Sequence, residues 1–93
     1  MTLLSDGDIE QRLADLPEWR ARGGAIERDL QLADFAEAVA FVNRVAEIAE
    51  ARNHHPDILV HGWNRVRLTL STHSEGGVTE ADFALAGEIE RAL

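Results

Sequence analysis

The segment richest in chemistry in this sequence is Glu50-Ala51-Arg52-Asn53-His54-His55-Pro56, in which two adjacent histidines precede a proline. Imidazole exchanges protons readily near neutral pH, because both of its protonation states are populated there without any help from the surroundings. Proline fixes its own φ angle and restrains the residue before it, so the two rings are held at a rigid corner of the chain. The segment therefore suits acid-base chemistry.

A third histidine, His73, follows a run of alternating apolar and polar residues and precedes a glycine-bearing loop. If this run is one strand of a hairpin, the hairpin can return His73 towards the His54-His55 corner. We therefore expect these three imidazoles to share one site. The remaining histidine, His61, is followed by a glycine, and we interpret it as a surface residue of a turn.

Two other interpretations of these residues stay open. Imidazoles at the C-terminal end of a helix can interact with its unpaired carbonyls and its dipole, so the histidine pair is also consistent with a simple helix cap. Zinc binding has enough candidate ligands, namely Glu50, His54, His55, His61 and His73. Adjacent histidines usually point apart, however, and no two-ligand motif such as HExxH is present, so we predict no metal site.

The two tryptophans, and the two arginines of the last predicted strand, also have more than one interpretation. Trp19 and Trp63 could stack on a flat heterocycle, but large aromatic side chains in a small domain more often fill the core or an interface. Arg65 and Arg67 fit either a solvated strand surface or a row of salt bridges between subunits. We assign these arginines no catalytic role.

The first half of the chain predicts a helix, a hairpin and a second helix. Ser5 precedes apolar residues at helical spacing, and Pro17 ends this first helix. Gly23-Gly24 lies between two short runs and is typical of a hairpin turn. Asp34 begins a longer helix, ending near Asn53, whose apolar residues recur at helical spacing: Phe35, Ala38, Val42, Val45 and Ala49.

The second half predicts another hairpin and a C-terminal helix. A strand at residues 58–60 is followed by a turn at His61-Gly62 and by a longer strand from Trp63 to about Thr72, whose polar face His73 continues. Thr79 and Asp82 form a capping pair at the start of the last helix. This order predicts an α+β fold, with one four-stranded antiparallel sheet and helices packed on a single face.

Composition narrows the function classes. The chain has 93 residues, which suits one domain over residues 1–93. Its net charge of −8 and its lack of any lysine or arginine run argue against nucleic-acid or membrane partners. Cysteine is absent, which excludes thiolate chemistry and disulfides. The acidic N-terminus has no apolar stretch of signal-peptide length, so we expect a cytoplasmic protein.

From about Leu16 onwards, the sequence resembles the pterin-4a-carbinolamine dehydratase family. The resemblance is carried by E-A-R-N-H-H-P-D, by N-R-V-R-L-T-L-S-T-H and by G-G-V-T-E-A-D-F-A-L-A, with P-E-W-R and D-F-A-E-A-V-A-F-V-N-R-V-A upstream. It implies dehydration of 4a-hydroxytetrahydropterin to quinonoid dihydropterin, without a metal or organic cofactor. It also implies a homodimer or homotetramer, and a functional link to an aromatic amino acid hydroxylase through pterin recycling.

The resemblance carries roles onto individual residues. It implies His54 and His73 as acid-base groups, with His55 contacting the pterin and assisting. By the same resemblance Glu50 orients a histidine or binds substrate, Trp19 is a pocket tryptophan, and the segment around Thr72 contributes backbone contacts to the pterin ring.

Two departures from the family pattern, and two other uses of the fold, bear on these expectations. The segment I-L-V-H-G-W-N-R is one residue longer than the usual hairpin, which predicts a bulge or an altered turn at His61-Gly62. Ser74 stands where an acidic residue is common, so any hydrogen bond made by that residue is changed. The same fold also serves as a transcriptional coactivator and as a RuBisCO assembly chaperone, so a non-catalytic binding or assembly factor is the alternative function.

Overall fold

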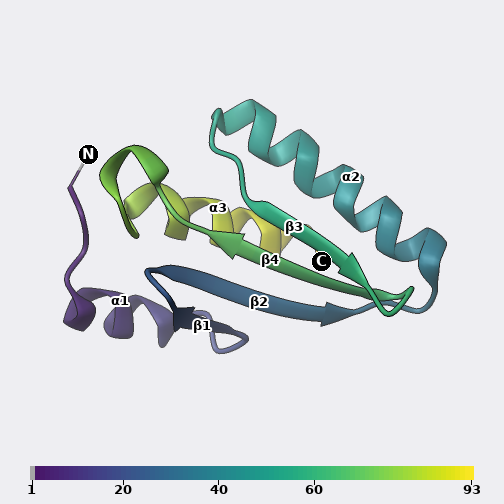
Figure 1. Cartoon of the computed structure of the whole chain (residues 1–93), viewed down its shortest axis with the longest axis horizontal. Helices are drawn as coiled ribbons and strands as arrows, with labels where there is room; N and C mark the ends of the chain where they lie inside the picture. The colour runs from purple at the N-terminus through teal and green to yellow at the C-terminus, as the bar shows by residue number, and fades with distance from the viewer. Residues whose placement is uncertain (1) are drawn as a thin grey trace.

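An antiparallel sheet with helices on one side makes up the computed structural model, which describes residues 2–93 (Figure 1). The strands are β1 (Trp19–Arg22), β2 (Ala25–Gln31), β3 (Asp57–His61) and β4 (Arg65–Leu70), and their order in the sheet is β1-β2-β4-β3. The helices are α1 (Asp6–Leu13), α2 (Phe35–Arg52), α3 (Glu80–Arg91) and the short 3-10 helix η1 (His73–Glu75). The predicted fold class, α+β with a four-stranded antiparallel sheet, is confirmed.

Each of the helices α1, α2 and α3 begins at a side-chain cap that can be read from the sequence. The Ser5 hydroxyl accepts a hydrogen bond from the backbone N–H of Asp8 at the start of α1. Asp34 does the same for α2, accepting from the backbone N–H of Glu37 at 2.8 Å. Thr79 and Asp82 form a reciprocal capping box at the start of α3. These bonds satisfy N–H groups that the first turn of a helix leaves unpaired, and so they fix where each helix starts. The predicted helix starts are confirmed.

The core lies between one face of the sheet and the two long helices. On β4, Val66, Leu68 and Leu70 alternate with polar residues and are completely buried. They pack in one cluster with residues of the other elements, among them Ile26, Phe41, Val45, Leu85, Ala86 and Ile89. Helix α2 buries only one of its faces in this cluster. Among residues 2–93, no helix is both long and apolar enough to cross a membrane. The opposite face of the sheet is left uncovered by helices (Figure 1).

The second hairpin differs from its prediction in a specific way. The loop between His61 and Arg65 has three residues, and both Gly62 (φ 53°) and Trp63 (φ 57°) adopt the left-handed conformation. This is the altered turn that the extra residue predicted. The strand predicted to begin at Trp63 begins instead at Arg65, because a left-handed residue cannot continue a strand. Trp63 is 63% exposed at the tip of the hairpin.

The predicted end of this strand was also wrong. β4 stops at Leu70, and Thr72 then forms an isolated bridge with Gly77, its N–H donating to the Gly77 carbonyl at 2.8 Å. His73 does not extend the polar face of the strand but opens η1. The bridge closes residues 73–76 into a tight loop, which redirects His73 out of the sheet.

Candidate functional site

Helix α2 ends in a geometry that fixes the direction of the histidine pair. Asn53 is left-handed (φ 50°), and its N–H bonds to the carbonyls of Ala49 and Glu50. The N–H of His54 donates to the Ala49 carbonyl at 3.1 Å. These bonds form a Schellman motif, the usual way to end a helix with a left-handed residue, and Asn tolerates that conformation better than most side chains. The helix end therefore sets where His54 and His55 leave the chain.

His54 contacts a buried carboxylate that comes from the other long helix. Its Nε2 lies 2.6 Å from Oδ1 of Asp82, which is completely buried at the start of α3. The second oxygen of Asp82 accepts from the Thr72 hydroxyl and from the Thr79 backbone N–H, both at 2.9 Å. An ionised carboxylate only accepts hydrogen bonds, so in a pair with ionised Asp82 the proton of His54 lies on Nε2. Nδ1 is then the nitrogen that can take up a proton.

Thr72 belongs to the same buried network. Its hydroxyl oxygen lies 2.7 Å from that of Thr79, besides donating to Asp82. Since both oxygens of Asp82 are occupied, the carboxylate cannot rotate without losing a bond, and the His54 ring is held in one orientation. Thr72, for which the family resemblance implies backbone contacts to a ligand, thus also has a side-chain role in positioning.

His55 and His73 complete the group of imidazoles. His55 Nε2 is hydrogen-bonded to the Glu50 carboxylate, one turn back on α2, and both side chains are exposed. His73 is exposed at the start of η1, and its imidazole bonds to no side chain among residues 2–93. The three histidines differ accordingly: one is fixed by a buried acid, one by an exposed acid, and one is free.

These imidazoles all line one hollow of about 310 Å³. Its lining comes from the end of α2 and from the loop after β4, and consists of Asn53, His54, His55, Pro56, Asp57, Ser71, Thr72, His73 and Ser74. The expected proximity of His73 to the His54-His55 corner is therefore found. Glu50 is outside the lining and reaches the hollow through its bond to His55.

Trp19 is not brought to this hollow. It is 4% exposed, and its Nε1 donates to the Glu90 carboxylate on α3 at 2.7 Å. The indole packs in the core because β1 turns it towards the helices, and its polar nitrogen is satisfied there. Trp19 is thus a core residue of this chain, and the contact with substrate that the resemblance implies stays a prediction.

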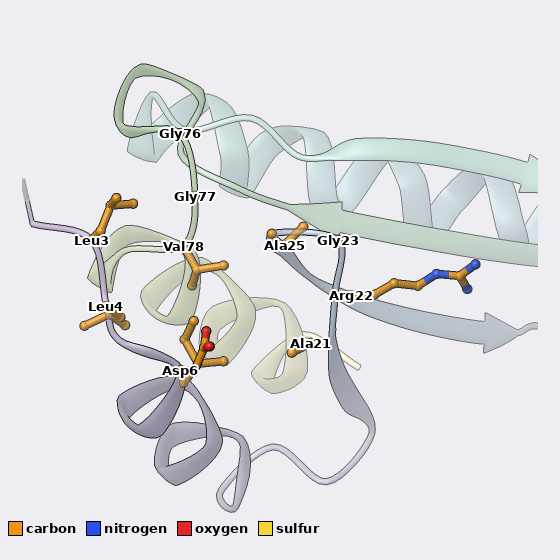
Figure 2. A pocket seen from close by; sticks show the side chains of 12 residues that line it. Leu3, Leu4, Asp6, Ala21, Arg22, Gly23, Ala25, Gly76, Gly77 and Val78 are labelled. Atoms are coloured by element: carbon orange, nitrogen blue, oxygen red, sulfur yellow. The ribbon is translucent and has the colours of Figure 1, made fainter.

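A larger hollow, of about 400 Å³, lies apart from the histidines, between the N-terminal segment and the turn of the first hairpin (Figure 2). Asp6 and Arg22 are its only ionisable lining residues, and the others are apolar residues and glycines. It has no pair of groups suited to exchanging protons. Within residues 2–93, no three histidine, aspartate or glutamate side chains are arranged to hold one metal ion.

Sequence reasoning missed the buried carboxylate of the site. Asp82 was predicted only as a helix cap, and its contact with His54, 28 residues away, was not expected. The signal in the sequence was that Asp82 is a cap residue on a helix that packs beside the end of α2. This signal is too weak to identify His54 as its partner. Ser71 and Ser74 also line the hollow without having been assigned to it.

Comparison with known proteins gives a consistent result over the whole chain. Residues 2–92 match the family model described as "Pterin 4 alpha carbinolamine dehydratase". A protein of Acidobacterium capsulatum, named "Putative pterin-4-alpha-carbinolamine dehydratase", is 52% identical over 100% of both chains. One of Nocardia farcinica with the same name is 50% identical, covering 95% of this chain and 92% of its own length.

Two solved structures share the fold. A transcriptional coactivator/pterin dehydratase from Brucella melitensis is 35% identical, with a TM-score of 0.90 and 97% of each chain covered. A pterin dehydratase-like protein identified as a RuBisCO assembly factor in the alpha-carboxysome is 25% identical, with a TM-score of 0.67, covering 80% of this chain and 87% of its own. The fold is thus found in proteins described in different functional terms.

Proposed function

We propose that this chain, which belongs to the pterin-4a-carbinolamine dehydratase family, catalyses loss of water from a 4a-hydroxytetrahydropterin. The observation that carries the proposal is the hollow in which His54, His55 and His73 meet, with His54 held by the buried Asp82. The product is the quinonoid dihydropterin, and the proposed role is recycling of the pterin used by an aromatic amino acid hydroxylase.

The reaction needs two proton transfers at neighbouring atoms of the substrate. The bond between the C4a carbon and its hydroxyl oxygen breaks, and a double bond forms from C4a to the adjacent ring nitrogen, which loses its proton. One group must accept that nitrogen-bound proton, and another must protonate the departing hydroxyl so that it leaves as water. Imidazoles at fixed positions can do both at neutral pH.

The contacts divide these tasks among the histidines. In our proposal His54, whose Nδ1 is left free by the bond to Asp82, and His73, which has no side-chain partner, exchange protons with the substrate. His55, oriented by Glu50, contacts the pterin and assists. Thr72 and Asp82 act as positioning residues, because their contacts are to His54 and to each other.

The experiment is a comparison of dehydration rates. Freshly generated 4a-hydroxytetrahydropterin is followed by absorbance with wild-type protein, with His54→Ala and with His73→Ala, against the spontaneous reaction. We expect each substitution to lower the enzymatic rate by roughly 10²-fold or more, as for acid-base groups, while circular dichroism shows an intact fold. Glu50→Gln lowers it by less than about tenfold, since that carboxylate is exposed, and Glu47→Gln, one turn earlier on α2, is the matched control. A wild-type rate equal to the spontaneous one contradicts the proposal.

The second candidate function is a non-catalytic binding or assembly factor. It is favoured by large apolar side chains that remain exposed near the start of α2 and on β3 and its following turn, namely Phe35, Val39, Leu59, Val60 and Trp63. Exposed apolar groups of this kind support contact with another protein chain. They also support the proposed homodimer or homotetramer. If the protein's biological effect persists in the His54→Ala, His73→Ala double variant, the binding role accounts for it.

A further inference from the structure

The open face of the sheet carries a row of polar side chains that the proposed reaction does not use. The strand register places Gln31 on β2, Arg65 on β4 and His61 on β3 directly beside one another. Side chains that face each other across adjacent antiparallel strands lie on the same face, about 5 Å apart at Cβ. Three nitrogen-bearing side chains therefore form one line across the sheet, at the opposite end of β4 from the histidine hollow.

The next residue on the same face of β4 is Arg67, and it is already neutralised. Its Nε donates to Oδ1 of Asp29 at 2.8 Å, while Arg20 donates to Oδ2 at 2.7 Å. The hydrogen bond from Arg67 has the largest effect and that from Arg20 the second largest, and together they lower the pKa of Asp29 to about 2. Asp29 is therefore charged at any ordinary pH. Asp29 is thus shared between two arginines and has little capacity left for a third.

Arg65 differs from its neighbours because, within residues 2–93, no carboxylate pairs with it. Its side chain passes over the turn, close to the α-carbon of Gly62, where an added Cβ would lie 3.5 Å from the arginine Cδ. A guanidinium offers five N–H donors in a rigid fork and accepts none, so Arg65 has donors to offer to the open space that it lines. That space is a hollow of about 340 Å³ lined by Asp29, Leu30, Gln31, His61, Arg65 and Arg67.

We propose that this hollow binds a small oxyanion, of the phosphate or carboxylate class. Arg65 supplies the charge and a bidentate donor pair, the Gln31 amide supplies a neutral donor, and His61 supplies a ring N–H. Asp29 keeps Arg67 in place at the edge of the site and limits its net positive charge. A chain of net charge −8 repels anions on average, so retention of one here depends on this local excess of arginine.

Inorganic phosphate is the probe, and residue-resolved NMR is the measurement. Phosphate is titrated into the ¹⁵N-labelled full chain at constant ionic strength, and the backbone amide shifts of Gln31, His61 and Arg65 are followed. We expect saturable shifts at these amides, with smaller ones at His55 and His73. Acetate in a parallel titration shows whether a carboxylate occupies the same site.

Three variants decide the assignment. Arg65→Gln weakens phosphate binding about tenfold, since it removes a charge-assisted donor pair. Asp29→Asn tightens it severalfold, because it removes a negative charge from the lining and releases Arg67. Arg44→Gln is the matched control: it makes the same change of net charge on α2, where Arg44 lies over the ring of Phe41, and it leaves the affinity unchanged.

Each other outcome overturns the proposal. Equal affinities in Arg65→Gln and Arg44→Gln mean that phosphate responds only to the net charge. Linear, unsaturated shifts mean that no site exists. Shifts at the same amides on raising the protein concentration without phosphate mean that acidic side chains of a second copy fill the hollow instead.

Discussion

Asp82 Oδ1 lies 2.6 Å from His54 Nε2, joining the start of α3 to the end of α2 through a carboxylate that is completely buried. The same side chain closes the capping box of α3. One residue therefore stabilises a helix start and orients an imidazole of the candidate site. The two tasks use different oxygens, so a substitution can affect them unequally.

Asp82→Asn tests this division. The amide oxygen can still accept from the Thr79 N–H, whereas its NH₂ group cannot accept the proton on His54 Nε2. We expect the dehydration rate to fall roughly 10²-fold, the value typical of losing an acid-base contribution, with about 1–3 kcal/mol lost from the free energy of unfolding. Glu80→Gln removes the same charge from the same turn of α3, and it should keep the wild-type rate. A folded Asp82→Asn protein with full activity would show that His54 needs no partner.

Asn53 gives a second prediction, because its left-handed backbone sets the exit of the histidine pair. Alanine has the same Cβ as asparagine but lacks the short polar side chain that favours the left-handed conformation, so Asn53→Ala should lower the free energy of unfolding by about 1 kcal/mol in urea titrations. Asn53→Gly should stay within about 0.5 kcal/mol of wild type, since glycine adopts the conformation freely but gains entropy when unfolded. Equal losses in both variants would assign the effect to the Asn53 side chain instead.

Trp19→Phe separates a core role from a ligand-binding role. Phenylalanine keeps the apolar ring but cannot donate to Glu90, which retains its 2.7 Å bond from Arg28. We expect thermal or urea unfolding to show a loss of about 1 kcal/mol, and the KM for the pterin to change by less than about twofold. A raised KM with unchanged stability would place Trp19 in contact with substrate, as the family resemblance implies.

Asp29 predicts a component of the acid sensitivity of the fold. Its pKa is lowered to about 2 by Arg67 and Arg20 in the folded chain, whereas an unfolded aspartate titrates near 4. The unfolded state therefore binds a proton first as the pH falls, and the stability contributed by Asp29 above about pH 4 is lost between about pH 4 and pH 2. Urea unfolding across this range should show a shallower pH dependence for Asp29→Asn. The same slope in both proteins would contradict the prediction.

Local signals account for the parts of the fold that were predicted from the sequence. The caps at Ser5, Asp34 and Thr79 act within three residues of themselves, and the alternation along β4 follows from burial of one face, so each can be read without knowing the rest of the molecule. The gathering of the histidines in one hollow also followed, because a hairpin returns the chain to where it began.

The parts that were missed depend on contacts between distant segments. Asp82 meets His54 only because α3 packs beside the end of α2. Trp63 takes a left-handed conformation because the turn must accommodate the extra residue. The next residue, Asn64, is fixed by two hydrogen bonds with Leu32, of 2.8 and 2.9 Å. Neither effect has a local pattern, and propensity alone favours a strand at Trp63.

The distribution of arginines over the sheet has an electrical consequence. All nine basic side chains are arginine, and Arg20, Arg22, Arg65 and Arg67 lie on the open face of the strands, where the acidic strand residues are Glu27, Asp29 and Asp57. The helices and loops hold the other fourteen of the seventeen acidic residues. The open face thus has four arginines against three carboxylates, whereas the rest of the chain has five arginines against fourteen carboxylates, so the bare sheet is the least negative part of the molecule. The field of a charged neighbour therefore rotates the protein before the two make contact. An anion is repelled by the net charge at long range, but on close approach it meets the arginine face first.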